Sequence, residues 1–366
     1  MDLLTPLDRR FLARSLELGR RGWGRVQPNP MVGCVLVRDG VVVAEGWHAE
    51  YGGPHAERVA LDQAGAAAAG SVAYVSLEPC AHTGKTPPCA DALVAAGVTR
   101  VVYGAADPGR DSGGGARRLA EAGIEVVGPL LSESQARQEN PAFFHRHRGQ
   151  GPYLALKLAV SLDGRISART GQSSVVTGPA SHEEVHRLRA GHDAIVVGSE
   201  TALIDDPRLT VRQGGIHARV PPARVVLDTT LRLPLQARLF EDVGHAPLHL
   251  FTSPTADPGR EGALLERGAI VHRVAAGSSG LDLDAVLDRC VGLGFTSLLV
   301  EGGARLASSL LRDRRVHRLY LFTAPRFLGP DAPEAFPGGG PVGTWRRVGP
   351  ARLFVEDLLT ILEPEG

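Results

Sequence analysis

A histidine and a glutamate two residues apart, His55 and Glu57, are followed along the chain by a Pro-Cys pair ending at Cys80 and then by Cys89. A zinc ion prefers soft or borderline ligands in a tetrahedral shell, and a catalytic zinc keeps one position open. Zinc deaminases carry residues in this order, with the glutamate as a proton shuttle that does not bind the metal. The pattern therefore predicts that His55, Cys80 and Cys89 bind one Zn²⁺ and that Glu57 is the catalytic residue.

Glu57 has a defined part in that chemistry. Two thiolates cancel the charge of the ion and make it a weaker Lewis acid than a zinc held by three imidazoles, so a base beside it is useful. Glu57 would take a proton from the attacking water, deliver it to a ring nitrogen and assist departure of the amine as ammonia. A structural zinc with His82 as its fourth ligand is the alternative, but it leaves Glu57 without a role. Cys34 and Cys290 are expected to be small core residues.

The composition bears on the substrate and on the location of the protein. The 366-residue chain is longer than one typical domain, and 40 Lys+Arg balance 40 Asp+Glu. Nucleic-acid binders usually carry excess positive charge, and aromatic residues, at 5%, offer few platforms for stacked bases. No apolar stretch could span a bilayer, charges interrupt the apolar residues at the N-terminus, and four cysteines do not make a disulfide framework. We expect a cytoplasmic protein with a small-molecule substrate that binds neither nucleic acid nor membrane.

Apolar runs alternate with helical patterns along the chain, which predicts an α/β architecture. The pattern breaks around Asn140-Pro141 and Gly151-Pro152, so we predict domains over 1–149 and 150–366. Strands are expected at 31–37, 41–44, 72–77, 101–104, 125–127, 153–159, 194–198, 224–228, 248–252, 270–274, 298–301, 319–323 and 352–362. Helices are expected at 57–69, 90–96, 116–122, 179–190, 261–267, 283–292 and 304–312.

One of these helices carries His182-Glu183-Glu184-Val185-His186, which matches the H-E-x-x-H motif of zinc proteases. No third ligand follows at the metzincin spacing, and Arg187 and Arg189 add positive charge to the same helix. We therefore expect a solvated helix face here, not a metal site.

A second motif, Glu301-Gly302-Gly303, follows an apolar strand and precedes a helix. Glycines at this place allow a phosphate to approach backbone N–H groups at the positive end of a helix dipole. The motif is a candidate nucleotide-binding site.

Several segments of the first half together form a long and specific pattern. They are Pro28-Asn29-Pro30, Val32-Gly33-Cys34, Pro54-His55-Ala56-Glu57 and the stretch 78–89, whose two cysteines are nine residues apart. The pattern closely resembles the deaminase of riboflavin biosynthesis, which in that family is fused to a reductase. The resemblance implies a cytidine-deaminase-like three-layer domain and a diaminopyrimidinone substrate carrying a ribose 5-phosphate. It assigns Asn29, His82 and Lys85 to substrate contacts. The chain departs from the family after Asp107-Pro108, where it has Gly109-Arg110 and then residues 111–115.

The second half resembles the reductase part of the same bifunctional family, in the segments 156–165, 193–195, 201–212 and 301–303. The resemblance implies a dihydrofolate-reductase-like α/β fold and NADPH as cofactor. By motif position, the residues that face the substrate would be Ser173, Arg189, Leu209, Arg212 and Glu301. Those that line the NADPH site would be Ala159, Val175, Thr201, Asp205, Thr229, Gly303, Ala304, Arg305, Leu306, Ala307, Ser308 and Ser309. Lys157 or Asp205 would assist proton movement as the ribose ring opens. Val175 stands where the family often has tryptophan.

The two resemblances together predict a bifunctional enzyme of riboflavin biosynthesis, which we expect to be a homo-oligomer. It would deaminate 2,5-diamino-6-(5-phosphoribosylamino)pyrimidin-4-one and then reduce the ribosyl chain with NADPH, giving 5-amino-6-(5-phosphoribitylamino)uracil. A nucleoside or nucleic-acid deaminase with an accessory binding domain is the alternative. It explains the zinc residues but neither Lys85 nor the second half. A zinc-stabilised scaffold without catalytic activity is the third hypothesis.

Overall fold

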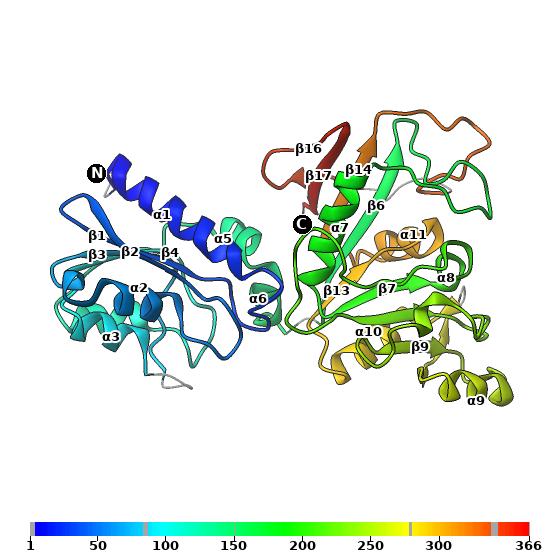
Figure 1. Cartoon of the computed structure of the whole chain (residues 1–366), viewed down its shortest axis with the longest axis horizontal. Helices are drawn as coiled ribbons and strands as arrows, with labels where there is room; N and C mark the ends of the chain where they lie inside the picture. Colours follow the sequence, from blue (N-terminus) through cyan, green and yellow to red (C-terminus); the bar gives the residue numbers. More distant parts are fainter. Residues whose placement is uncertain (1–3, 83–86, 150, 278–279, 338–342, 366) are drawn as a thin grey trace. The chain divides into compact units, whose positions relative to one another are not determined.

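The chain forms two compact units, Met1–Gln150 and Gly151–Gly366, each built around its own β-sheet (Figure 1). The computed structural model describes residues 4–82, 87–149, 151–277, 280–337 and 343–365. Both units are α/β, as the alternation of apolar runs and helical patterns predicts. Within these ranges, no helix combines the length and the apolar character that crossing a bilayer requires.

The first unit contains a 5-stranded sheet in the order β2-β1-β3-β4-β5. Its strands are β1 (Gly33–Arg38), β2 (Val41–Trp47), β3 (Val72–Leu77), β4 (Arg100–Ala105) and β5 (Glu125–Val127). β1 pairs antiparallel with β2 and β3, whereas β3, β4 and β5 run parallel. Asp39 and Gly40, both at positive φ, close the β1–β2 hairpin. Because β3 and β4 are parallel, the polar residues that follow them meet at one edge of the sheet.

Helices cover both faces of this sheet, which gives the three layers implied by the resemblance (Figure 1). They are α1 (Pro6–Gly19), α2 (Ala56–Ala64), α3 (Cys89–Ala95), α4 (Gly115–Glu121), α5 (Glu133–Glu139) and α6 (Pro141–Arg146), with 3-10 turns at Arg20–Gly22 and Gly65–Ala68. Successive residues of β1 point to opposite faces. Cys34 packs in the cluster that includes residues of α2 and α3, while Val35 packs with α1. Cys34 is therefore a core residue, as predicted.

The helix α1 was not expected from the sequence, because charged residues interrupt its apolar ones. One of these charged residues, Asp8, is only 2% exposed. Asp8 forms a capping box with Thr5 and accepts hydrogen bonds from Tyr74 at 2.7 Å and Arg100 at 2.9 Å. Burial alone would raise the pKa of Asp8, but the hydrogen bonds from Tyr74 and Thr5 lower that pKa to about 2. A charge that interrupts the sequence pattern thus anchors the helix to the sheet.

The predicted break around Asn140 is a one-residue joint between two helices. α5 ends at Glu139 and α6 begins at Pro141, whose fixed φ suits a first helical turn. Between them, the Asn140 side chain bonds Met31 twice, accepting from its N–H at 2.7 Å and donating to its carbonyl at 3.1 Å. These bonds tie the last helices of the unit to the loop that precedes β1.

The second unit contains a 10-stranded sheet whose main path is β10-β9-β8-β7-β13-β6-β14-β17-β15. The strands of this sheet are β6 (Tyr153–Ser161), β7 (Ala194–Gly198), β8 (Ala223–Leu227), β9 (Leu248–Thr252), β10 (Ile270–Arg273), β13 (Ser297–Val300), β14 (Arg318–Ala324), β15 (Trp345–Arg347), β16 (Arg352–Phe354) and β17 (Asp357–Pro364). Neighbours from β10 to β14 are parallel, and β17 is antiparallel to β14. The strand order reverses where β13 lies between β6 and β7. In open parallel sheets, ligands bind at the carboxyl ends of the strands at such a reversal.

Helices also cover both faces of this sheet. They are α7 (Pro179–Ala190), α8 (Ser199–Asp205), α9 (Pro258–Glu266), α10 (Leu283–Gly292) and α11 (Ala304–Arg312), with a 3-10 turn at Arg238–Phe240 and a small hairpin of β11 (Ala276–Gly277) and β12 (Gly280–Leu281). Val196 of β7 packs in the cluster that includes α10 and α11, whereas its neighbour Val197 packs with α9. Cys290 is fully buried in the first of these clusters, as predicted. The sequence did not predict α8.

Two expectations for this unit are wrong. The single strand expected at 352–362 is a hairpin of β16 and β17, which turns at Val355 with a φ of 59°. The two loop residues, Val355 and Glu356, include neither the glycine nor the asparagine that usually marks such a turn, and a β-branched residue rarely takes positive φ. The helix α7 is not a solvated face, since Glu184 and His186 are 5% and 4% exposed. His186 Nδ1 accepts the backbone N–H of Arg212 at 3.3 Å.

Candidate active sites

Three residues from separate segments of the first unit converge in a metal-binding geometry. His55 Nδ1 lies 3.3 Å from Cys89 Sγ and 3.6 Å from Cys80 Sγ. Nitrogen and sulfur ligands of one tetrahedral zinc would lie about 3.6 Å apart, so the three side chains fit this ion. In the described part of the chain, no other group of His, Cys and acidic residues has such a geometry, and His82 is not part of this one. The H-E-x-x-H motif of α7 does not belong to the described group with this geometry.

The local structure explains how the ligands meet. His55 is the N-cap of α2, Cys89 opens α3, and Cys80 follows the end of β3. The backbone N–H of Cys89 donates to Cys80 Sγ at 3.4 Å, and the N–H of Ala90 donates to the Cys80 carbonyl at 3.2 Å. Hydrogen bonds from Cys89 and His55 lower the pKa of the Cys80 thiol to about 4. A thiolate, the form that binds metal, is thus favoured at Cys80.

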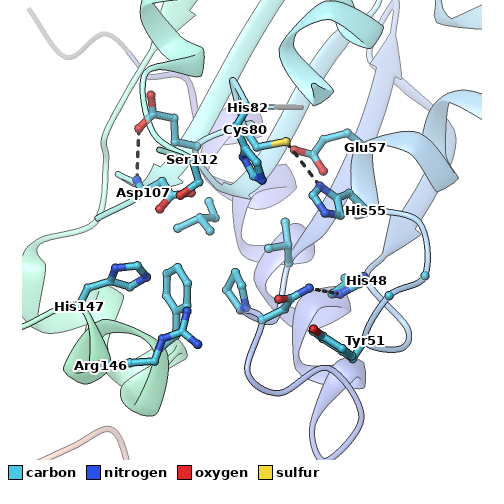
Figure 2. A pocket seen from close by; sticks show the side chains of 18 residues that line it. His48, Tyr51, His55, Glu57, Cys80, His82, Asp107, Ser112, Arg146 and His147 are labelled. Carbon is cyan, nitrogen blue, oxygen red and sulfur yellow. Dashed lines mark hydrogen bonds between the residues drawn. The ribbon is translucent and has the colours of Figure 1, made fainter. Parts of the chain in front are cut away.

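Glu57 lies in the first turn of α2, beside the metal-binding residues (Figure 2). Its side chain is buried, and the residue is only 3% exposed. Burial raises the pKa of Glu57 to about 7. A carboxyl group with a pKa near the working pH can both accept and return a proton, which suits a proton shuttle.

A cavity of ≈ 350 Å³ opens in front of these residues (Figure 2). It is lined by Asn29, Pro30, Val32, His48, Tyr51, Gly52, Gly53, His55, Glu57, Leu77, Glu78, Cys80, His82, Asp107, Ser112, Phe143, Arg146 and His147. Of the substrate contacts implied by the resemblance, Asn29 and His82 face this cavity, and Lys85 lies outside the described residues. The Nδ1 atom of His82 is buried and has no hydrogen-bond partner among the residues that the structure describes.

The sequence did not point to His48, which fixes the orientation of Asn29. His48 Nδ1 lies 3.0 Å from the Pro54 carbonyl and therefore donates to it. His48 Nε2 is then an acceptor, and the Asn29 amide nitrogen donates to it at 3.2 Å. His48 directly follows β2. Its position directly after a strand is the one sequence feature that could have indicated a site residue. No sequence motif identifies Phe143, Arg146 and His147 as site residues, because only the tertiary structure brings α6 to the cavity.

The loop that departs from the family's pattern is held by Glu78. The Glu78 carboxylate accepts the backbone N–H groups of Asp107 at 3.2 Å, Gly114 at 3.1 Å and Ala116 at 3.0 Å. The N–H of Ala81 also donates to the Ser112 carbonyl at 3.0 Å. The altered loop is thus bonded to the segment that carries Cys80.

A Gly115→Ala variant is expected to lose deaminase activity by about 100-fold. A Cβ atom at Gly115 would lie 1.7 Å from the Pro79 carbonyl oxygen, so Pro79 and the adjacent Cys80 must move. A displacement of about 1 Å at a site of this kind can cost two orders of magnitude in rate. Ammonia release and zinc per chain measure the effect. A Gly262→Ala variant, whose new Cβ meets open space, is the control. Normal activity of Gly115→Ala would contradict the assigned packing.

In the second unit, several expected cofactor residues gather at the carboxyl ends of the parallel strands. Gly303, the N-cap of α11, donates its N–H to Thr201 Oγ1 of α8 at 3.0 Å. Ala159 lies in β6, and Thr229 follows β8. The residues from Ala304 to Ser309 form the first part of α11, where Arg305 is exposed and pairs with Glu200 at 3.2 Å.

The expected substrate residues Arg189 and Glu301 bond each other. Arg189 Nε lies 2.5 Å from Glu301 Oε1 and Nη2 lies 2.8 Å from Oε2, with the two side chains 10% and 11% exposed. Arg189 Nη1 also donates to the Thr210 carbonyl at 3.1 Å. Burial lowers the pKa of Lys157, and the charges of Glu301 and Asp205 oppose that shift. Arg189, Glu301 and Lys157 therefore belong to one buried charge cluster.

The remaining expected residues lie around this cluster or apart from it. Leu209 is 2% exposed at a φ of 54°, and Arg212 Nη1 donates to Thr210 Oγ1 at 3.3 Å. Asp205 ends α8 and is exposed. Ser173 and Val175 lie on the exposed segment between β6 and α7, where the Val175 residue is 68% exposed. The structure does not bring these last two residues into the cluster.

Two family models match separate parts of the chain. Residues 6–105 match the family model of the cytidine and deoxycytidylate deaminase zinc-binding region, and residues 152–353 match that of the RibD C-terminal domain. The chain is 40% identical over 338 residues to the riboflavin biosynthesis protein RibD of Escherichia coli strain K12, with 89% of each chain covered. It is 37% identical over 329 residues to the Aquifex aeolicus protein of the same name, again with 89% of each covered.

Solved structures agree along nearly the whole length. Acinetobacter baumannii RibD, in form 1, has a TM-score of 0.83 at 34% identity, over 98% of this chain and 99% of that one. A diaminohydroxyphosphoribosylaminopyrimidine deaminase/5-amino-6-(5-phosphoribosylamino)uracil reductase from Thermotoga maritima has a TM-score of 0.81 at 32% identity, with the same coverage. The chain belongs to the RibD family of riboflavin biosynthesis proteins, in which a zinc-dependent deaminase is fused to an NADPH-dependent reductase.

Proposed function

We propose that residues 1–149 deaminate the phosphoribosylated diaminopyrimidinone and that residues 150–366 reduce the deaminated product with NADPH. The observation that carries the first assignment is the convergence of His55, Cys80 and Cys89 beside the buried Glu57. The second rests on the Thr201–Gly303 contact and the charge cluster at the carboxyl ends of parallel strands. A nucleoside or nucleic-acid deaminase would have no use for this second site.

In the deaminase site, we assign one role to the metal and one to each of three residues. Bound Zn²⁺ supplies a Lewis acid that makes water a nucleophile near neutral pH. Glu57 removes one proton of the attacking water and passes it to the ring nitrogen. It then takes the proton of the new hydroxyl group and passes it to the amine, which leaves as ammonia while the carbonyl forms. Asn29, held by His48, presents its carbonyl oxygen to the cavity, where it can accept a hydrogen bond from the heterocycle. His82 lines the same cavity and is proposed to contact the same ligand.

In the reductase site, the protein binds and orients. NADPH supplies the hydride that opens the ribosyl ring. We propose that the cofactor binds at the start of α11, where backbone N–H groups can hold its phosphates. The residues proposed to line this site are Gly303 to Ser309, Ala159, Val175, Thr201, Asp205 and Thr229. Ser173, Leu209 and Arg212 are proposed to face the substrate, together with Arg189 and Glu301. Lys157 is half-buried, its charge interacts with that of Glu301, and it is the proposed source of the proton, with Asp205 as the second candidate.

Two assays on the purified full-length chain test this function. The first measures ammonia released from the phosphoribosylated diaminopyrimidinone and zinc per chain, for which one ion is expected. The second measures NADPH oxidation with the deaminated product. Release of ammonia from cytidine or single-stranded DNA, with none from the pyrimidinone, would favour the alternative deaminase. Ammonia release without NADPH oxidation would reject the reductase assignment.

We also propose that the enzyme is a cytoplasmic homo-oligomer. Cys34, Cys80, Cys89 and Cys290 are free thiols, and zinc thiolates persist in a reducing compartment. Leu353 and Val355 of the C-terminal hairpin are 70% and 83% exposed, and apolar surface of this kind is typical of subunit contacts. Sedimentation velocity gives the mass in solution, and a monomer at micromolar concentration would contradict the proposal.

A further inference from the structure

The deaminase cavity has a second end, formed by α6 and the residue after it. Phe143, Arg146 and His147 line this end, and Figure 2 shows Arg146 and His147 across the cavity from His55 and Glu57. The Phe143 ring meets the His147 ring edge to face, with 4.8 Å between their centroids. Aromatic packing of this kind fixes the direction of the imidazole. The cavity therefore has a metal end and an α6 end.

The charges that line the cavity are unequal. Its carboxylates are those of Glu57, Glu78 and Asp107, whereas Arg146 supplies the single Lys or Arg side chain among the described lining residues. Two of the carboxylates are already used within the protein. Glu78 accepts three backbone N–H groups, and Asp107 accepts the N–H of Gly109 at 2.8 Å. Among the described lining side chains, Arg146 is therefore the permanent cation that an anionic ligand would meet.

Arg146 differs from the other arginines of the same region. Arg137 pairs with Glu133 at 2.7 Å, and Arg148 pairs with the same carboxylate. For Arg146, the described part of the chain records no carboxylate within ion-pair distance. Its charge also contributes to lowering the pKa of His147, after the larger effect of burial. Arg137 and Arg148 thus share the Glu133 carboxylate, while the forked donors of Arg146 remain available to a ligand.

We propose that Arg146, with His147 beside it, binds the phosphate monoester of the deaminase substrate. This inference rests on the proposed function, which places a heterocycle at Glu57 and a phosphoryl group at the far end of a ribosyl linker. With the amine at the metal end, the phosphoryl group must lie away from the zinc, and the α6 end offers the guanidinium that it needs. Guanidinium groups bind phosphates through two parallel hydrogen bonds, so Arg146 both attracts and orients the substrate. Arg146 is therefore a determinant of specificity for the phosphorylated compound.

An Arg146→Gln variant tests the proposal on two substrates, the phosphoribosylated diaminopyrimidinone and the same compound without its phosphate. We expect KM for the phosphorylated substrate to rise by about 10- to 100-fold, the usual effect of one charge-assisted contact, with kcat little changed. KM for the dephosphorylated compound should not change. An Arg148→Gln variant removes a guanidinium two residues away, outside the cavity, and should leave both values as in the wild type. Equal changes for the two substrates, or no change for either, would overturn the proposal.

Binding of inorganic phosphate to the zinc-loaded protein separates this proposal from the assignment of the reaction. Titration calorimetry should give an affinity for phosphate that falls by about 10-fold or more in Arg146→Gln and not in Arg148→Gln. If the wild type released no ammonia from either compound, the proposed function would fail, yet this titration would still decide the phosphate site. Equal phosphate affinity in the wild type and Arg146→Gln would refute it. Zinc content and Tm should match the wild type, because Arg146 is exposed and lacks an ion-pair partner in the described structure.

Discussion

A Glu57→Gln variant is expected to release ammonia about 100- to 10,000-fold more slowly than the wild type, with zinc still bound. General acid–base catalysis contributes about this much to a rate, and glutamine has the shape of glutamate but cannot carry the proton. The zinc ligands His55, Cys80 and Cys89 are unchanged, so metal content should stay at one ion per chain. NADPH oxidation with the deaminated product should also be unchanged, because it is assigned to the second unit. Stopped assays of ammonia with zinc analysis measure both effects.

The control for this experiment lies on the same helix. Asp62 is exposed on α2 and pairs with Arg58 at 2.9 Å, away from the cavity. Asp62→Asn also replaces a carboxylate by an amide and should leave ammonia release within about twofold, since exposed ion pairs contribute little. If Glu57→Gln kept normal activity, another group would have to move the proton. Loss of zinc in Glu57→Gln would instead mean that Glu57 supports the metal.

The second large effect is expected from Arg189→Ala. This variant leaves the Glu301 carboxylate buried without the guanidinium that holds it at 2.5 and 2.8 Å. Breaking a buried ion pair costs about 3–5 kcal/mol. For a domain of this size, that is a fall in Tm of about 6–20 °C. NADPH oxidation should be lost, while ammonia release at low temperature persists, because each unit has its own core.

A paired substitution separates stability from function at this site. Arg189→Leu combined with Glu301→Leu removes both charges, and such replacements are often neutral or stabilising. We expect Tm to recover most of its loss and NADPH oxidation to stay absent, because the two residues proposed to face the substrate have lost their polar groups. Glu241→Gln, which breaks a more exposed ion pair with Arg208, should change Tm by only about 1–3 °C. Full activity of the double variant would exclude this pair from the reductase site.

Much of the secondary structure could be predicted from the sequence, because many strands are short apolar runs between clear turn signals. The bounds of β3, β7 and β9 agree residue for residue, as do those of α7 and α11. The convergence of His55, Cys80 and Cys89 could be predicted because the chemistry of a zinc site is restrictive and the motif is long. Among the predictions that were wrong or missing, one concerns a buried charge and one concerns a turn. Asp8 interrupts an apolar pattern but is buried, and Val355 takes a positive φ in a hairpin turn that lacks glycine and asparagine.

The arrangement of the sites needed the fold. Arg189 and Glu301 are 112 residues apart, and the sequence marked both as substrate contacts without indicating that they bond each other. Arg146 belongs to a helix that the sequence did not predict, and only tertiary contacts bring it to the cavity. Motifs locate groups that must be chemically special. The other residues that line a cavity need only a suitable shape and charge. Many residue types meet that need, so these positions form no recognisable sequence motif.

The two hydrogen bonds between Asn140 and Met31 restrict where the chain can be cut to separate its two enzymes. They attach α6 to the loop before β1, although α6 directly precedes the junction of the two units. A gene fragment that stops before this helix would encode His55, Glu57, Cys80 and Cys89, yet it would lack the residues of α6 that line the same cavity. Separation of the two enzymes, in the laboratory or in evolution, must therefore place its cut beyond the last residue that serves the first reaction. That requirement leaves only a few residues between the end of one enzyme and the start of the next.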